Sequence, residues 1–154
     1  GEAFVKSQIG ASVHLPQSGG AFLSVRGSDK EPLMPVARDV HELGFKLYAT
    51  SGTARAIEAH GLPVTRVNKV QEGRPHVVDL LINGDIHIVV NTVEETRNAV
   101  ADSRSIRTTA LAQRVACYTT TAGASAAVQG IRHLADPQVY SLQSLHKELA
   151  GVRR

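Results

Sequence analysis

The stretch GFKLYATSGTARAIEAHG, residues 44–61, decides the fold because it joins a strand pattern directly to a helix pattern. Its apolar run FKLYA, residues 45–49, is typical of a buried strand, and residues 51–60 are typical of a helix. Four small residues, TSGT at 50–53, connect the two. A strand that passes through a short turn into a helix is the building unit of α/β proteins.

The TSGT turn admits two interpretations. In the first, it serves only the helix, because Ser or Thr caps free N–H groups and Gly allows a tight turn. In the second, it binds an anion, because a helix N-terminus offers N–H donors and the positive end of a dipole. The hydroxyls of Thr50, Ser51 and Thr53 would then be further donors. Capping is the commoner use of these residues, so other parts of the chain have to decide between the two.

The alternation of strand and helix patterns runs through the chain from residue 21. It predicts a three-layer α/β/α fold with a five-stranded, mainly parallel sheet and helices on both faces. The most apolar run, IHIVVN at 86–91, is expected at the buried centre of the sheet. Asp29 and Gly44 are expected to cap the first helix. The expected strands are 21–25, 45–49, 64–67, 86–91 and 115–119, the expected helices are 28–44, 51–60, 76–83, 105–114 and 123–135, and the short segments 139–142 and 144–150 close the chain.

Composition limits the classes of function. The chain has 154 residues, 42% of them hydrophobic, with a net charge of +3 and a pI near 9.3. This mild basicity suits a small anionic ligand, and no dense run of Lys and Arg indicates nucleic-acid binding. No apolar stretch is long enough to span a membrane, and a single cysteine, Cys117, excludes a disulfide framework. We expect a cytoplasmic protein whose partners include neither nucleic acid nor membrane.

The first twenty residues differ from the rest. The segment GEAFVKSQIGASVHLPQSGG has no sustained period and lacks the apolar core of a signal peptide. We interpret residues 1–20 as a linker or the tail of a preceding domain, and residues 21–154 as one domain.

Small and polar residues follow every expected strand. In parallel sheets of this kind, ligands bind at the carboxyl ends of the strands. Lys30, Lys69 and the TSGT turn would form a phosphate cradle there, and Asn91 would contact a ribose or a base. The alternatives are solvated surface lysines and an asparagine that closes a turn. The positions expected to converge on one crevice are 26–30, 50–53, 68–69, 91–92 and 119–121.

This crevice is expected to bind an anion rather than to react with it. A general base would be a carboxylate or histidine held in the crevice, and none stands at a strand end. Asp29 and Glu72 are the nearest candidates. No histidine has metal-ligand spacing, so we predict no catalytic residue and no metal site. A cluster of arginines around Asp102 is interpreted as a partner face, a pocket rim or a solvated helix face: Arg97, Arg104, Arg107 and Arg114.

Several motifs resemble those of one known family. The chain is similar to the C-terminal regulatory domain of the bacterial carbamoyl-phosphate synthetase large subunit, which has the methylglyoxal-synthase-like fold. GEAFVKSQIGA at 1–11 resembles the end of the preceding synthetase domain of that subunit. The motifs that carry the resemblance are LSVRGSDK at 23–30, GFKLYATSGTARAIEAHG at 44–61, VNKVQEGRPHVVDLLINGDIHIVVNT at 67–92 and DSRSIRTTALAQRVACYTT at 102–120.

The resemblance implies a function for the parent protein and for this segment. The parent would make carbamoyl phosphate, for arginine and pyrimidine synthesis, from bicarbonate, ATP with magnesium or manganese, and ammonia that a glutaminase small subunit releases from glutamine. The segment would be non-catalytic and hold no cofactor. In the enteric bacterial members of the family it binds UMP as inhibitor and IMP as activator, beside the synthetase domains of the same chain.

The family pattern implies a set of effector-binding positions. In this sequence they are Ser24, Lys30, Thr50, Thr53, Lys69, Asn91 and, with a one-residue insertion near 94–97, Arg97. Val93 stands at the second threonine of the family's N-T-T motif, so one polar contact is absent. Cys117-Tyr118-Thr119 stands at the ornithine-associated Y-D-T, without its acidic residue, so ornithine control is not implied.

Two other functions stay open. The first is a methylglyoxal synthase-type lyase that acts on dihydroxyacetone phosphate, whose catalytic aspartate lies in a G-G-D stretch after the third strand. This chain has QEGRPH there, residues 71–76, and the cation of Arg74 cannot abstract a proton. The second is an interaction module without a ligand, which a nucleotide-dependent change in melting temperature would exclude.

Overall fold

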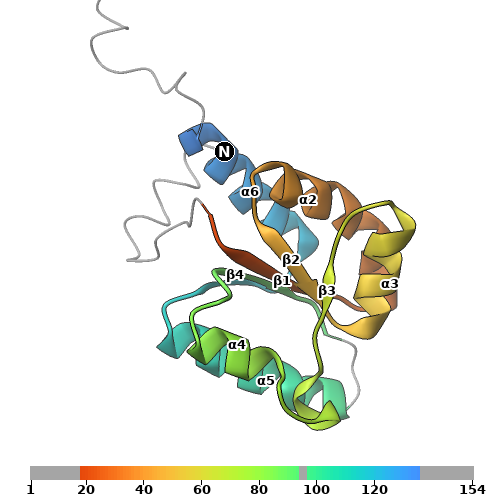
Figure 1. Cartoon of the computed structure of the whole chain (residues 1–154), viewed down its shortest axis with the longest axis vertical. Coiled ribbons are helices and arrows are strands. Elements are labelled where there is room, and N and C mark those ends of the chain that lie inside the picture. Colours follow the sequence, from red (N-terminus) through yellow and green to blue (C-terminus); the bar gives the residue numbers. More distant parts are fainter. Residues whose placement is uncertain (1–17, 94–96, 136–154) are drawn as a thin grey trace, which may run out of the picture.

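Five parallel strands form the middle layer of the molecule (Figure 1). The computed structural model describes residues 18–93 and 97–135, so the expected segments 139–142 and 144–150, and most of the expected tail at 1–20, lie outside the described residues. The elements are β1 (Gly20–Ser24), η1 (Gly27–Asp29), α2 (Lys30–Glu42), β2 (Lys46–Ala49), α3 (Ser51–Ala59), β3 (Thr65–Arg66), η2 (Val70–Glu72), α4 (Val77–Ile82), β4 (Ile88–Asn91), α5 (Arg97–Ala112), β5 (Ala116–Tyr118) and α6 (Thr121–Ala135).

The strand order is β3-β2-β1-β4-β5, and every pair is parallel. Helices α2, α3 and α6 cover one face of the sheet and α4 and α5 cover the other (Figure 1). The predicted three-layer fold with five strands is therefore confirmed. The prediction that residues 86–91 occupy the centre is wrong in detail, because β1 is central and β4 lies beside it. Strands β1 and β4 are both covered on two faces by helices. Their apolar content therefore does not indicate which of the two is central.

The alternation of side chains along the inner strands divides the apolar core in two. Ala21 and Leu23 of β1 pack toward α2, α3 and α6, whereas Phe22 packs toward α4 and α5. In β4, Ile88 and Val90 belong to the first core and Val89 to the second. This is the period of two that a strand imposes, and it fixes the register of the sheet relative to both helical layers.

The largest difference from the sequence prediction is the start of α5. This helix begins at Arg97, eight residues before the expected start at 105. Its first turns carry Asp102 and Ser103 on the inner side, and apolar residues take over only from Ile106. A helix whose inner face lines a polar cavity does not show apolar periodicity there, so the pattern could not reveal it.

The predicted position of Asp29 as a cap of α2 is confirmed, whereas Gly44 follows the C-cap instead of occupying it. Asp29 occupies the N-cap of α2 but makes no side-chain cap bond, because its carboxylate accepts a 2.8 Å hydrogen bond from Arg26 Nε. Gly44 follows the C-cap Leu43 with a φ of 94°, a conformation that glycine adopts at little cost. Among the described residues, no helix is both long enough and apolar enough to cross a membrane.

Candidate functional site

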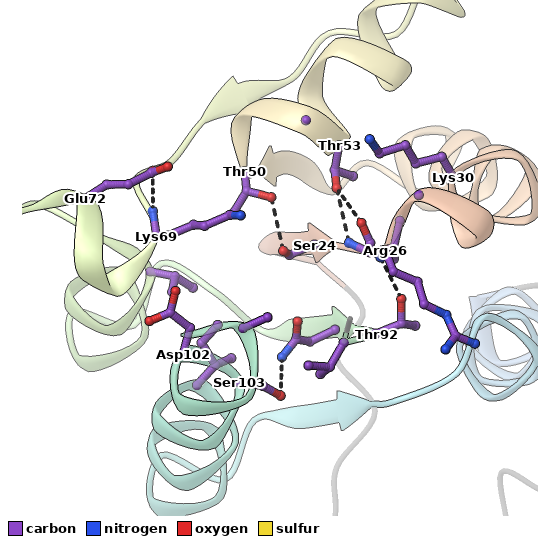
Figure 2. A pocket seen from close by; sticks show the side chains of 18 residues that line it. Ser24, Arg26, Lys30, Thr50, Thr53, Lys69, Glu72, Thr92, Asp102 and Ser103 are labelled. Atoms are coloured by element: carbon purple, nitrogen blue, oxygen red, sulfur yellow. Dashed lines mark hydrogen bonds between the residues drawn. The ribbon is translucent and has the colours of Figure 1, made fainter. Parts of the chain in front are cut away.

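A cavity of about 420 Å³ opens at the carboxyl ends of the central strands. The strand order reverses between β1 and β4, and α/β proteins bind ligands at such reversals. Figure 2 shows side chains from both helical layers around this cavity. Its lining comes from the ends of β1 and β4, the first turns of α2 and α3, the loop after β3, and α4 and α5: Ser24, Val25, Arg26, Gly27, Lys30, Thr50, Gly52, Thr53, Lys69, Glu72, Val77, Asn91, Thr92, Val93, Ala99, Asp102, Ser103 and Ile106.

The TSGT turn binds β1 to α3 through its side chains. Thr50 stands at the N-cap of α3 without a side-chain cap bond, and its hydroxyl lies 3.1 Å from that of Ser24. The Thr53 hydroxyl, only 1% exposed, accepts a hydrogen bond of 3.1 Å from the Val25 N–H and donates one of 3.5 Å to the Val25 carbonyl. Simple side-chain capping therefore does not describe Thr50. The first N–H groups of α3 have no partner inside the helix.

Two lysines border this helix terminus. Lys30 is half-buried at the start of α2, and a Cβ atom built on Gly52 would lie 3.4 Å from its Nζ. The glycine thus keeps space between the ammonium group and the first turn of α3. Lys69 is exposed, and Figure 2 shows its side chain extending toward Thr50 from the opposite side. Its backbone N–H donates a 2.8 Å hydrogen bond to Glu72 Oε2, which closes the loop.

The floor of the cavity is formed by the ends of β1 and β4. Asn91 is 4% exposed, and its Nδ2 donates a 2.9 Å hydrogen bond to Ser103 Oγ of α5. Thr92 Oγ1 accepts a 3.0 Å hydrogen bond from the backbone N–H of Arg26. The first bond connects the end of β4 to α5, and the second connects the residue after β4 to the residues after β1. Together they hold Asn91 in place.

The expectation that no carboxylate lies in the crevice is wrong. Asp102 of α5 lines the cavity, and so does Glu72 of the loop. Burial raises the pKa of Asp102 and the Glu72 carboxylate raises it further, whereas the cation of Lys69 and the His76 side chain act to lower it. Asp29, the other candidate from the sequence, is paired with Arg26 and does not line the cavity. The lining therefore combines two carboxylates with three cations, of which Arg26 is paired with Asp29.

Helix α5 supplies four lining residues that the sequence analysis did not place in the crevice: Ala99, Asp102, Ser103 and Ile106. Asp102, Ser103 and Ile106 are spaced by one and three residues and lie on the same side of α5, and Val77 faces them from α4. Their spacing would have indicated one common helix face, if the expected helix had begun before residue 102 instead of at 105. With Val25, Val93 and Ala99, the aliphatic side chains form an apolar wall.

Six of the seven expected effector-binding residues line the cavity. They are Ser24, Lys30, Thr50, Thr53, Lys69 and Asn91. The seventh, Arg97, is exposed at the start of α5 and is not part of the lining. Asn68 is also absent from it, because its amide donates to the carbonyls of Gly73 and Pro75. Residues 119–121 follow the edge strand β5, away from the reversal point, and this explains why the expected convergence fails there.

Metal chemistry finds no support in the described part of the chain, where no three His, Cys, Asp or Glu side chains come together to hold an ion. The cavity lining offers two lysines and a helix N-terminus, which suit an anion, together with two carboxylates and several aliphatic side chains.

Comparison with known proteins gives a consistent result. The model of the MGS-like domain family matches residues 32–119. The carbamoyl phosphate synthase large chain of Ralstonia nicotianae is 56% identical over 149 residues, which are 97% of this chain and 14% of that one. The large chains of Pseudomonas aeruginosa and Pasteurella multocida are 50% and 48% identical over 99% and 96% of this chain, and again 14% of theirs.

Among solved structures, methylglyoxal synthase from Elizabethkingia anophelis NUHP1 superposes with a TM-score of 0.57 over 74% of this chain and 79% of that one. At 20% sequence identity, this likeness concerns the fold alone. The chain thus spans about one seventh of the length of the large chains that it matches, over a C-terminal piece of them.

Proposed function

Because the chain belongs to the MGS-like domain family, we propose that it is the regulatory domain of a carbamoyl phosphate synthase large chain and binds a nucleoside monophosphate. The parent protein would be an ATP-dependent ligase that makes carbamoyl phosphate with a glutaminase small subunit. Identity of 48–56% over nearly the whole chain, to large chains from three bacteria, supports this assignment.

The observation that carries the ligand proposal is the position of Lys30 and Lys69 on either side of the α3 N-terminus (Figure 2). A phosphate monoester has a charge of about −1.5 to −2 at pH 7. The positive end of one helix dipole does not balance this charge, and two ammonium groups do. The phosphate would lie at Gly52, where the absence of a side chain leaves the N–H groups accessible.

The opposite side of the cavity suits the nucleoside. Asp102 would accept hydrogen bonds from the ribose hydroxyls, as an acidic residue does in dinucleotide-binding folds. The aliphatic wall that includes Val77 and Ile106 would pack against the base, and Asn91 would face the ribose or the base. Val93 offers no hydrogen bond where the family has threonine. We therefore leave the choice between UMP and IMP, and the sign of the regulation, to measurement.

One observation favours a second candidate, the methylglyoxal synthase-type lyase. A carboxylate with a raised pKa lies in the cavity near a phosphate cradle, as a general base for dihydroxyacetone phosphate would require. The regulatory function remains the preferred one, because the relatives that match almost the whole chain are carbamoyl phosphate synthases.

The experiment is calorimetric titration of the chain, and of the full-length parent, with UMP, IMP and inorganic phosphate. At least one nucleotide should bind, and Lys69→Ala should weaken that binding by about tenfold to a hundredfold, because a hydrogen bond to a charged group contributes about 1.5–3 kcal/mol. The matched control is Lys46→Ala, which removes an exposed lysine from the amino end of β2 and should change nothing.

Two results would contradict the proposal. Equal affinities of wild type and Lys69→Ala would place the phosphate elsewhere. Absence of nucleotide binding to the full-length parent would exclude a nucleotide effector altogether.

A further inference from the structure

Helix α5 has two functional faces, and only one of them belongs to the cavity. Ala99, Asp102, Ser103 and Ile106 line the cavity from its inner side. The outer side carries Arg97, Arg104 and Arg107, all exposed, and Arg114 follows the end of the helix. The helix contains a single acidic residue, Asp102, which is on the inner side. Its outer face is therefore positively charged without compensation from the helix itself.

These arginines contrast with those of the opposite layer. There, Arg132 forms ion pairs of 3.0 Å with both Asp39 and Glu42, and Arg66 forms one of 3.0 Å with Glu58. Within residues 18–93 and 97–135, neither Arg104 nor Arg107 has a carboxylate partner. They stand three residues apart, a spacing at which like charges on a helix are neighbours and repel each other.

Large apolar side chains are exposed on the same layer. Leu111 of α5 is 80% exposed, Val100 of α5 is 44% exposed and Ile82 of α4 is 57% exposed. Among the side chains whose exposure the structure describes, these three are the exposed large hydrophobic ones, and all three lie on α4 or α5. On α5, both are interleaved with the arginines at helical spacing: 97, 100, 104, 107 and 111.

We propose that this outer face of α5, centred on Arg104, Arg107 and Leu111, is a docking surface for an acidic protein surface with an apolar centre, located on the remainder of the parent polypeptide. Protein interfaces are enriched in arginine and depleted in lysine, and α5 contains no lysine. The large chains matched by this chain continue over about six sevenths of their length outside it, so the occupant is available in the same molecule.

A nucleic acid is the less suitable occupant. Single strands stack their bases on aromatic side chains, and α5 has none. Phosphate backbones are bound by cationic and polar groups. The exposed Leu111 would make no favourable contact with such a backbone. The guanidinium groups of α5 surround the apolar Leu111. The complementary partner surface would therefore carry carboxylates around an apolar side chain.

This inference rests on the proposed place of the chain within a longer polypeptide and not on nucleotide binding. It places α5 between ligand and partner, because the cavity residues and the docking residues occupy different sides of one helix.

The test is photo-crosslinking in the full-length parent with Leu111→p-benzoylphenylalanine, followed by mass spectrometry of the crosslinked peptides. We expect crosslinks to a segment of the parent outside residues 1–154 that carries Asp or Glu. The control, Arg38→p-benzoylphenylalanine on the exposed side of α2, should give none to that segment. Crosslinks from position 111 to a second copy of this chain, to the small subunit or to nucleic acid would overturn the proposal, as would the absence of any crosslink.

A charge reversal tests the electrostatic part. In the crosslinking protein, Arg104→Glu with Arg107→Glu should lower the crosslink yield at least about tenfold, because like charges placed across an interface repel each other. Arg38→Glu is the matched control and should leave the yield unchanged. Circular dichroism and the melting temperature verify that each variant is folded. An unchanged yield in the folded double variant would contradict charge complementarity, and nucleotide titration of the same variants separates this result from a failure of the effector site.

Discussion

Thr53 illustrates how one side chain can support both the fold and the site. Its hydroxyl satisfies the N–H and the carbonyl of Val25, where β1 ends. A buried backbone N–H without a partner costs free energy comparable to the lost hydrogen bond, so this contact has a structural role whether or not a ligand is present. The Thr50 hydroxyl, by contrast, hydrogen-bonds to the Ser24 hydroxyl and not to a backbone group of β1.

The two threonines should therefore differ in their contribution to stability. Thr53→Val should lower the free energy of unfolding by about 1–3 kcal/mol, because it leaves the Val25 backbone groups unsatisfied. Thr50→Val should lower it by about 0.5–1.5 kcal/mol at most. Urea unfolding with unchanged m-values measures both. Equal losses in the two variants would show that the contact with Val25 does not matter.

The ionised Asp102 carboxylate should lower the stability of the fold at neutral pH while it contributes to nucleotide binding. Burial raises its pKa, so the folded state holds the proton more tightly than the unfolded state does. As pH rises above the ordinary aspartate pKa of about 3.9, the unfolded state loses its proton first, and ionised Asp102 then destabilises the fold. At pH 7 we expect Asp102→Asn to be more stable than the wild type, whereas the two should converge below that pKa.

The same substitution should weaken nucleotide binding, because the amide is a poorer acceptor for ribose hydroxyls than the carboxylate. Melting temperatures between pH 3 and pH 8 and titration at pH 7 measure the two effects. Ser105→Ala, an outer residue of the same helix whose hydroxyl bonds only the Ala101 carbonyl, is the control for helix propensity. A variant that is less stable at pH 7 and binds normally would exclude the assigned role of Asp102.

At the scale of the element, the α3 N-terminus depends on Gly52 for its access to ligand. The glycine lies in the first turn of α3, and a Cβ atom added to it would have Lys30 Nζ as its nearest neighbour. That neighbour is the end of a flexible side chain, which can move aside. A methyl group therefore fits the fold, but it would occupy the space between the helix N–H groups and the ammonium group where the phosphate is proposed to bind.

Gly52→Ala should accordingly separate folding from binding. Alanine is favoured over glycine in helices by up to about 1 kcal/mol, so stability should stay equal or increase. Nucleotide affinity should decrease, and the affinity for inorganic phosphate should decrease with it. Gly27→Ala is a suitable comparison, since Gly27 also lines the cavity and a Cβ there meets no atom within 4 Å. Unchanged affinity in Gly52→Ala would show that the phosphate does not approach this turn.

Helix α5 is the element on which the site depends most. It supplies Asp102, holds Asn91 through Ser103, and closes the cavity with Ile106. Because its polar inner face resembles a solvent-exposed face in sequence, neither its start at Arg97 nor its position over the cavity follows from hydrophobic spacing.

At the scale of the whole molecule, the likeness to methylglyoxal synthase requires a direct test, because a fold does not determine a function. We expect no methylglyoxal formation from dihydroxyacetone phosphate. Arg74 stands where the resemblance requires an aspartate, and its guanidinium lies 3.5 Å from Asp79 rather than in the cavity.

An assay of methylglyoxal with the purified chain measures this, with a bacterial methylglyoxal synthase as positive control. Turnover above background that Asp102→Asn abolishes would reverse the conclusion, because it would make Asp102 the general base. Turnover that Asp102→Asn leaves intact would indicate a contaminating enzyme.

Sequence alone determined the class of this protein. Alternating strand and helix patterns sufficed for five parallel strands with helices on both faces, because burial on two faces imposes long apolar runs that are visible in one dimension. The strand-end rule brought Lys30, Thr50, Thr53, Lys69 and Asn91 to a common cavity, because each lies within a few residues of a strand end, and the family resemblance added Ser24.

Only the tertiary structure decided the rest. Asp102 reaches the cavity from the middle of a helix, Arg97 remains outside it, and the TSGT hydroxyls bind neighbouring elements rather than their own helix. Each of these outcomes depends on how α5 and the carboxyl ends of β1 and β4 meet, which are segments far apart in the chain. Local patterns record which residues are buried, whereas the direction in which a polar side chain points is set by packing between distant segments.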